Sequence, residues 1–326
     1  MKKLSLLICV IFLLNSVFAN DVKLVSWNVE TFFDAVTSGD EYKEFRSSSK
    51  WNEASYKNRL FKLVEAIKIL DADVLVLIEL ENKEILYDIS NMMQDMSFNR
   101  NKMYKFSCFA KNSGSAIGCG ILSRFELKNL SVHNVFVKGK SVQPDMRPVM
   151  RVLCSSGGND FVLYVNHWKS MSGGKLKTEN WRNWQESVLS ALIFRDLAAG
   201  TKNVVACGDF NRDLFDFSFE SKEFSSTPQF FLRHFISRKG IFNYKTQVYS
   251  AWFLNGECAE PGSYFYKGNW SRIDNIFIQG SVVVKNFSSV QNELWCTDEG
   301  IPEKYSVFYN SGFSDHLPLE CVFEIN

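Results

Sequence analysis

Runs of apolar residues recur along the whole chain at lengths typical of β-strands. They are Val22–Trp27, Asp73–Glu79, Ile117–Ser123, Val149–Leu153, Phe161–Asn166, Asn203–Gly208, Ile273–Ile278 and Leu317–Phe323. Two longer segments, Tyr56–Leu70 and Asn180–Ala199, carry apolar residues at a spacing of three and four, which predicts helices with one apolar face. Because strands outnumber helices and some strands are apolar throughout, the pattern favours sheets that pack together under covering helices.

Polar residues able to bind a metal, donate a hydrogen bond or transfer a proton stand at the borders of these strands. In the stretch VVACGDFNRD, Asp209 and Asn211 follow a strand two residues apart, so an extended chain would point both to the same side. One such border is ordinary turn chemistry, since Asp and Asn are common in turns. The feature recurs at Asn28, Glu79, His167, Asp209, Asn211, Asp274, Asp315 and His316. This recurrence predicts that the residues form the rim of one site.

The first residues have the pattern of a secretory signal peptide, with Lys2 and Lys3, an apolar run and a small-residue motif that ends at Ala19. The apolar run is too short to span a bilayer. We expect cleavage after Ala19, export, and a monomeric single domain in residues 20–326, because no repeat or linker divides them. Without the leader, 35 basic and 36 acidic residues remain, which argues against a broad basic groove for nucleic acid but not against a small cationic pocket.

Seven cysteines follow the leader. They are Cys108, Cys119, Cys154, Cys207, Cys258, Cys296 and Cys321. In an exported protein some are expected to pair, and the odd number leaves at least one free, for which Cys207 in an apolar strand is the candidate. The pairings we consider are Cys108–Cys119 and Cys258–Cys296. No Cys-x-x-Cys motif or Cys/His cluster occurs, so the spacing supports no zinc site.

In their order along the chain, the motifs at these borders resemble those of the endonuclease/exonuclease/phosphatase superfamily, the deoxyribonuclease I-like proteins. The matching motifs are SWNVE (26–30), IELEN (78–82), ILSR (121–124), RP (147–148), NHWKS (166–170), GDFN (208–211), RIDNIFI (272–278) and SDHLP (314–318). GDFN or SDHLP alone would be a weak match, but the ordered set is specific. SWNVE, ELEN and NHWKS followed by Trp181-Arg182-x-x-Gln185 are most similar to a secreted bacterial nuclease-like branch.

The resemblance implies an α/β (α+β) fold, a four-layer sandwich of two packed mixed β-sheets flanked by helices. It also implies divalent-metal-dependent cleavage of phosphoester bonds at one end of the sheets. Glu79 is the implied main metal ligand, supported by Asn28 and Asp315, while Glu81 is a rival that the period of two places further out. Mg²⁺ is the expected cation, with Ca²⁺ or Mn²⁺ as alternatives, because a hard cation reconciles an acidic site with an anionic phosphodiester.

The remaining motif residues are implied to carry out the chemistry. Asp274 and His316 resemble a pair in which the carboxylate fixes the imidazole tautomer and stabilises the imidazolium. Asp209 would orient or deprotonate the attacking water, and Asn211 would hold a phosphoryl oxygen; whether Asp209 or His316 is the base stays open. His167 would bind phosphate or protonate the leaving oxygen.

Among the other charged residues, Arg147 would donate to phosphate, where its bidentate geometry is an advantage over Lys, and Lys169 is a weaker phosphate candidate. Arg151, His133 and His234 are interpreted as structural. The chain departs from the family pattern at two places. Ile78 stands where the family often has Gln, and no carboxylate between residues 110 and 122 is placed to steer His167.

The preferred function is a secreted metal-dependent phosphodiesterase, an endonuclease on DNA or RNA. A sphingomyelinase-type phospholipase or a phosphomonoesterase of the inositol phosphatase kind is the alternative, since the same chemistry serves them. A binding protein that has lost catalysis is a third interpretation, against which the complete residue set argues. The aromatic stretches Leu214–Phe231 and Tyr264–Tyr266 could contact substrate or membrane, but core packing is the preferred interpretation for most of them.

Overall fold

A computed structural model describes residues 21–47, 50–136, 143–156, 159–220, 227–235, 243–254 and 256–325 of the chain. The expected leader and its cleavage after Ala19 lie outside these residues. The α-helices of the described part are α1 (Lys43–Ser47), α2 (Glu53–Leu70), α3 (Glu84–Asp95) and α4 (Lys175–Ala198). Short 3₁₀-helices span Arg100–Lys102 and Leu214–Asp216.

The strands form two large mixed sheets and two small hairpins. The six-stranded sheet has the order β17 (Val282–Ser289), β18 (Leu319–Ile325), β1 (Val22–Phe32), β2 (Val74–Leu80), β4 (Gly118–Ser123), β3 (Phe106–Ala110). The eight-stranded sheet has the order β5 (Glu126–His133), β6 (Val149–Ser156), β7 (Asn159–His167), β8 (Asn203–Asp209), β16 (Asp274–Gly280), β11 (Asn243–Ser250), β10 (Gln229–Phe235), β9 (Ser218–Glu220). The hairpins are β12 (Phe253–Leu254) with β13 (Glu257–Cys258), and β14 (Tyr264–Tyr266) with β15 (Asn269–Ser271).

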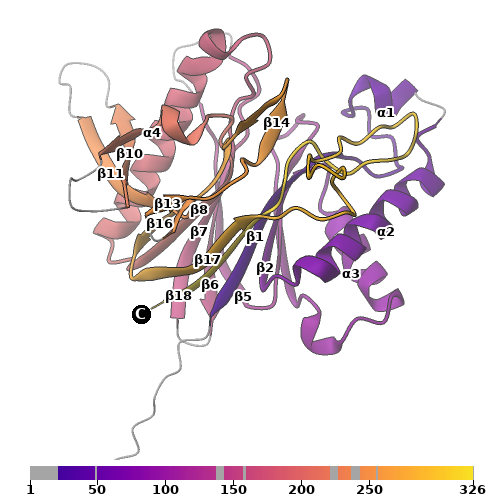
Figure 1. Ribbon diagram of the computed structural model, residues 1–326, viewed down its shortest axis with the longest axis horizontal. Helices are drawn as coiled ribbons and strands as arrows, with labels where there is room; N and C mark the ends of the chain where they lie inside the picture. Colours follow the sequence, from indigo (N-terminus) through magenta and orange to yellow (C-terminus); the bar gives the residue numbers. More distant parts are fainter. Residues whose placement is uncertain are drawn as a thin grey trace, which may run out of the picture.

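The two large sheets pack face to face, and helices cover both outer faces (Figure 1). α4 covers the eight-stranded sheet, where it packs on β10 and β11, while α2 and α3 cover the six-stranded sheet. The predicted four-layer α/β sandwich is therefore confirmed.

Alternation along the strands builds the two cores. Val22 and Leu24 of β1 face the core between the sheets, whereas Val25 and Trp27 face the core under α2 and α3. β1 pairs in parallel with β2, and β7 with β8. Strands buried on both faces read as continuous apolar runs, which is why the sequence revealed them.

Both predicted helices are present, as α2 and α4, and every predicted apolar run contains a strand. α2 begins after Asn52, whose side chain accepts a hydrogen bond from the Ser55 backbone N–H at 3.1 Å. The pattern did not predict α3, although its buried residues Ile85, Leu86, Ile89 and Met93 have helical spacing. In the described part of the chain, no helix combines the length and apolar character needed to cross a membrane.

The core interpretation of the aromatic stretches is only partly right. Leu214, Phe217 and Phe230 are buried, but Phe215 and Phe219 are half exposed. None of the three aromatic residues of β14 is buried, because this hairpin lies outside both large sheets. For Tyr264–Tyr266 the core interpretation is wrong.

The two considered disulfide pairings are wrong, since all seven described cysteines are free thiols. On the paired strands β3 and β4, Cys119 lies opposite Ala110, and Cys108 lies opposite Ile121. The two cysteines are therefore offset by two residues along the strands and do not face each other as a disulfide requires. Cys258 packs against the core between the sheets, whereas Cys296 lies in the core under α2 and α3. Cys207 is a buried free thiol, as predicted.

Candidate active site

The polar strand borders meet at one edge of the sandwich. The parallel pairing of β1 with β2 places Asn28 opposite the residue before Glu79. The parallel pairing of β7 with β8 sets His167 beside Asp209, and antiparallel β16 sets Asp274 on the other side of Asp209. A pocket of about 610 Å³ opens at this edge, and its lining includes Glu30, Tyr42, Glu79, Arg147, His167, Lys169, Asp209, Asn211, Tyr264, Lys304, Asp315 and His316.

Hydrogen bonds join Asn28 and Glu79 at the ends of β1 and β2. The Asn28 amide Nδ2 donates to Glu79 Oε1 and to Asp209 Oδ2, both at 3.2 Å. Its amide oxygen instead accepts from the Glu30 backbone N–H at 3.0 Å. Thr31 N–H donates to Glu79 Oε2 at 2.8 Å. Glu79 and Thr31 have φ angles of 73° and 46°, a left-handed conformation that is uncommon without glycine and that recurs at functional sites.

A tight turn, rather than an extended strand, brings the side chains of Asp209 and Asn211 together. Asn211 has a φ of 47°, and its backbone N–H and side-chain Nδ2 donate to Oδ1 and Oδ2 of Asp209 at 2.7 and 2.9 Å. Gly208 has a φ of 134°, and a Cβ there would lie 1.9 Å from the carbonyl oxygen of Asn166, so only glycine lets β7 approach this closely. Burial, reinforced by the Asp274 charge, raises the pKa of Asp209 to about 7.

Asp274 and His316 form a buried pair, with 2.8 Å between Oδ2 and Nδ1. Burial alone would lower the pKa of His316, but the charge and hydrogen bond of Asp274 raise it well above its usual value. The turn that carries His316 is tied to β1, because Ser314 Oγ accepts from the His316 N–H at 3.1 Å and donates to the Asn28 carbonyl at 2.6 Å. Asp315 Oδ1 lies 3.8 Å from His316 Nε2.

His167 is buried at the end of β7. Its Nε2 lies 3.5 Å from Glu79 Oε1 and 3.7 Å from Asp209 Oδ2. Its Nδ1 has no hydrogen-bond partner among the described residues, in keeping with the missing steering carboxylate. Burial and the nearby charge of Arg147 hold the pKa of His167 well below its usual value, which favours a neutral imidazole.

Arg147 and Lys169 add positive charge to the pocket, which Lys304 also lines. Arg147 donates to the Trp168 carbonyl at 3.4 Å, and burial together with the Arg147 charge lowers the pKa of Lys169. Glu81 does not line the pocket, and its Oε2 accepts a hydrogen bond from the Asp34 N–H at 2.8 Å. The residues interpreted as structural also lie outside the pocket lining: Arg151 pairs with Asp196, His133 contacts Ser131, and His234 contacts the Ser187 carbonyl.

Glu30 is a pocket residue to which the sequence reasoning gave no role. Its Oε1 pairs with Lys304 Nζ at 2.8 Å, and its Oε2 accepts from the Tyr305 N–H at 3.0 Å. Asn28 and Glu30 are two residues apart, as Asp209 and Asn211 are. This spacing could have identified Glu30 as a site residue from the sequence. No motif marks Lys304, because it belongs to a loop.

A buried arginine of α2 supports the segment that carries Glu30. Arg59 donates to the carbonyl oxygens of Val29 and Thr31, each at 3.0 Å, and also to that of Glu30. Its guanidinium lies 3.7 Å from the centre of the Tyr305 ring. These bonds satisfy backbone oxygens where β1 leaves regular geometry, and so stabilise its left-handed turn.

The donor set of the pocket fits a hard divalent cation. Glu30, Glu79 and Asp315 present carboxylate oxygens, the ligands that such cations prefer. Burial and the like charge of Asp315 raise the pKa of Glu30, and a bound cation would relieve this repulsion. Among the described residues, the group whose ligand atoms lie within 4.8 Å of one another is Asp209, Asp274 and His316. Asp274 and His316 are bonded to each other, and Glu30 is paired with Lys304, so a cation would displace an existing contact at either place.

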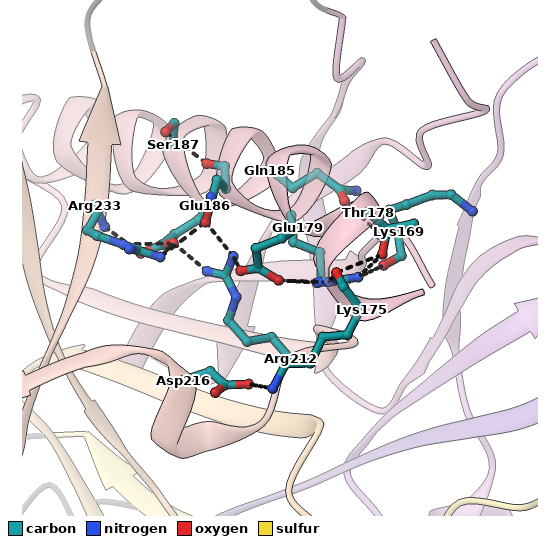
Figure 2. A network of polar contacts seen from close by, with 12 residues as sticks. Lys169, Lys175, Thr178, Glu179, Gln185, Glu186, Ser187, Arg212, Asp216 and Arg233 are labelled. Atoms are coloured by element: carbon teal, nitrogen blue, oxygen red, sulfur yellow. Dashed lines mark hydrogen bonds and ion pairs between the residues drawn. The ribbon is translucent and has the colours of Figure 1, made fainter. Parts of the chain in front are cut away.

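Buried charges on α4 hold the turn that follows β8 (Figure 2). Arg212, the neighbour of Asn211, is almost fully buried, and its guanidinium binds Glu186 and Glu179 of α4. Arg233 of β10 binds Glu186 from the other side at 2.7 Å. The position of Asn211 therefore depends on a charge network that lies outside the pocket.

The same helix holds the segment that follows β7. Gln185 Oε1 accepts from the Lys169 N–H at 2.7 Å (Figure 2). Arg182 Nη1 donates to the Lys169 carbonyl at 3.1 Å. Arg182 also binds Glu179 at 2.7 Å, which joins the two groups of contacts. α4 thus positions both loops that border the pocket on the side of the eight-stranded sheet.

Comparisons with known proteins agree with this geometry. A family model described as the Endonuclease/Exonuclease/phosphatase family matches residues 23–324. TDP2 from C. elegans has a similar structure at a TM-score of 0.57 and 16% identity, over 93% of this chain and 75% of that one. The human Nocturnin catalytic domain with bound sulfate anion gives a TM-score of 0.56 at 16% identity, over 94% and 95% of the two chains.

A third similar structure is that of ANGEL2, a 2',3'-cyclic phosphatase, in complex with adenosine-2',3'-vanadate, with a TM-score of 0.59 at 15% identity over 94% and 96% of the chains. At such identities the likeness to solved structures shows the fold. A search of curated proteins by sequence finds no match.

Proposed function

This chain belongs to the endonuclease/exonuclease/phosphatase family of metal-dependent phosphoesterases, and from that premise we propose that it is an exported endonuclease that hydrolyses DNA or RNA. One observation carries the proposal: a single pocket joins carboxylates suited to a divalent cation, the cationic Arg147 and Lys169, and a His–carboxylate pair. This combination suits an anionic diester that gains charge during attack.

Glu79, Glu30 and Asp315 would hold the cation, for which we propose Mg²⁺. The bound cation would offset charge on the phosphoryl oxygens. Asn28 positions Glu79, because its amide nitrogen rather than its oxygen faces that carboxylate. Arg147 and Lys169, which line the same pocket, would bind the phosphate oxygens.

The pKa values favour one assignment of the base. His316 has a raised pKa and is protonated near neutrality, so it would donate a proton or hydrogen bond to a phosphate oxygen. Asp209, with a pKa of about 7, is available to accept the proton of the attacking water. Neutral His167 would hydrogen-bond a phosphoryl oxygen. The Asn211 amide, whose Nδ2 donates to Asp209 and to the Trp168 carbonyl, would exchange one of these acceptors for a phosphoryl oxygen when substrate binds.

Further observations support a nucleic acid substrate and export. The ANGEL2 structure holds an adenosine vanadate, which is a nucleotide-like ligand on the same fold. The leader pattern that ends at Ala19 is the basis for export, and residues 20–326 would act as a monomeric catalytic domain.

The proposal is tested with a substrate panel of plasmid DNA, single-stranded RNA, sphingomyelin liposomes and inositol phosphates, each with Mg²⁺, Ca²⁺, Mn²⁺ or excess chelator. We expect cleavage of DNA or RNA with Mg²⁺ and none with chelator. The variant His316→Ala should be inactive, while His133→Ala, the same change on outer strand β5, should keep wild-type activity. Hydrolysis of sphingomyelin or inositol phosphates without cleavage of nucleic acid would refute the nuclease assignment, and nicking with excess chelator would refute the metal dependence.

A further inference from the structure

The β14–β15 hairpin rises beside the pocket, outside both large sheets. In Figure 1, β14 lies in the upper part of the view, above β1 and β8. Its base is fixed to the site, because Tyr264 forms a β-bridge with His316 and the Ser263 carbonyl accepts from the Leu317 N–H at 2.7 Å. The hairpin therefore has a defined position relative to the His316 imidazole.

The two faces of the hairpin differ. On one face Phe265 packs on Trp270, with ring centres 5.1 Å apart, and this contact stabilises the hairpin itself. On the other face the rings of Tyr264 and Tyr266 lie nearly parallel, with 18° between their planes and 6.2 Å between their centres. The Tyr264 ring lies 4.9 Å from that of His316. Both tyrosines line the pocket, and Tyr266 is 57% exposed.

We propose that Tyr264 and Tyr266 form a stacking subsite for a nucleobase next to the phosphate that is cleaved. This inference rests on the proposed function, and it narrows the substrate to nucleic acids that carry a base beside the cleaved phosphate. Flat aromatic faces attract bases of any sequence, because every base has a π-face. The inositol ring lacks such a face, whereas a choline ammonium would contact the same rings through cation–π attraction, so the vesicle measurement below separates a base from a choline headgroup. A base stacked on the rings would remove their apolar faces from water, which is favourable.

The charges around the tyrosines suit the same ligand. Lys267 Nζ lies 5.2 Å from the centre of the Tyr266 ring, at the outer end of the hairpin. Arg147 and Lys169 line the same pocket as the two tyrosines. A strand whose base stacks on the tyrosines would thus meet positive charge both at the hairpin and within the pocket, where its phosphates lie.

The test compares two fluorescent single-stranded oligonucleotides of equal length, one with bases throughout and one with abasic tetrahydrofuran residues. Stacking is worth roughly 1–3 kcal/mol per base, so the wild-type kcat/KM should be about 5–150-fold higher for the oligonucleotide with bases. Tyr266→Ala should lower kcat/KM for that substrate by a similar factor and leave the abasic substrate within about two-fold. Tyr266→Phe should behave as wild type. Tyr309→Ala removes a tyrosine that is 75% exposed and outside the pocket lining, and should change nothing.

A second readout does not depend on turnover. Anisotropy with excess chelator should show weaker binding of the base-containing oligonucleotide to Tyr266→Ala. Equal cleavage of both oligonucleotides by the wild type, or an equal loss on both in Tyr266→Ala, would overturn the stacking subsite while the nuclease assignment stands. Cleavage of neither oligonucleotide, together with no cleavage of plasmid DNA or RNA in the substrate panel, would overturn both. Sedimentation with sphingomyelin vesicles that is lost only in Tyr266→Ala would identify the hairpin as a lipid-docking surface instead.

Discussion

Replacement of Glu186 by glutamine should destabilise the protein strongly, because it removes the negative charge shared by two arginines. Glu186 has no exposed side-chain area, and neither does Arg212. The Glu186 carboxylate accepts from the Arg212 guanidinium, and it also accepts from the Arg233 backbone N–H and Nη2 at 2.8 and 2.7 Å. Glutamine keeps a similar shape and one acceptor oxygen, so the change tests the charge rather than the packing.

The magnitude follows from the burial of the partners. Removal of one member of a buried ion pair typically destabilises a protein by about 3–5 kcal/mol, because the other charge stays buried without compensation. The Arg233 side chain is 33% exposed and can be hydrated, so the lower end, about 3 kcal/mol, is expected for Glu186→Gln. At roughly 2–4 °C for each kcal/mol, the melting temperature should fall by about 6–12 °C.

Urea unfolding followed by tryptophan fluorescence measures this change in the free energy of unfolding. The matched control is Glu53→Gln on α2, whose carboxylate pairs with Lys57 at 2.7 Å but is 74% exposed, so its urea midpoint should match that of the wild type. A double variant, Glu186→Gln with Arg212→Met, should lose less than the sum of the single variants, since the two residues compensate each other. If Glu186→Gln lost less than about 1 kcal/mol, the network would be hydrated and the reasoning would fail.

Three further predictions concern the site and the thiols. Glu79→Gln should weaken metal binding measured by calorimetry and nearly abolish turnover, whereas Glu81→Gln, whose carboxylate turns away from the pocket, should leave metal affinity within a few-fold. His316→Ala should lower the rate by at least about 10²-fold, and adding Asp274→Asn should lower it little further because the two act as a unit; losses that multiply would show that they act independently. Burial raises the pKa of Cys207 to about 12, so at pH 8 almost no thiolate is present and a disulfide reagent should leave native Cys207 unmodified. In denaturant the chain without its leader should release seven equivalents of thiol, and a smaller number would indicate a disulfide.

The sequence by itself determined most of the secondary structure and the residue types of the site. The periods of two and of about three and a half are local properties, so β8 and α2 could be read from short windows of sequence. The boundaries were less certain, since β1 continues to Phe32, well beyond the predicted end at Trp27. The polar residues at the strand ends were visible for the same local reason, and their order along the chain carried the resemblance to the family.

Only the tertiary structure decided which of these residues meet. Glu30 enters the pocket because β1 bends into a left-handed turn that Arg59 supports from a separate helix. Cys108 and Cys119 miss each other because strand register sets them two residues apart.

Glu186 and Arg212 form an ion pair although 26 positions separate them, and no short window of sequence contains this contact. The same is true of the exposure of the Tyr264 and Tyr266 rings on one face of the β14–β15 hairpin. The reason is physical: periodicity depends on near neighbours, whereas such contacts depend on strand order, register and the packing of whole layers, which the chain settles only when it folds together.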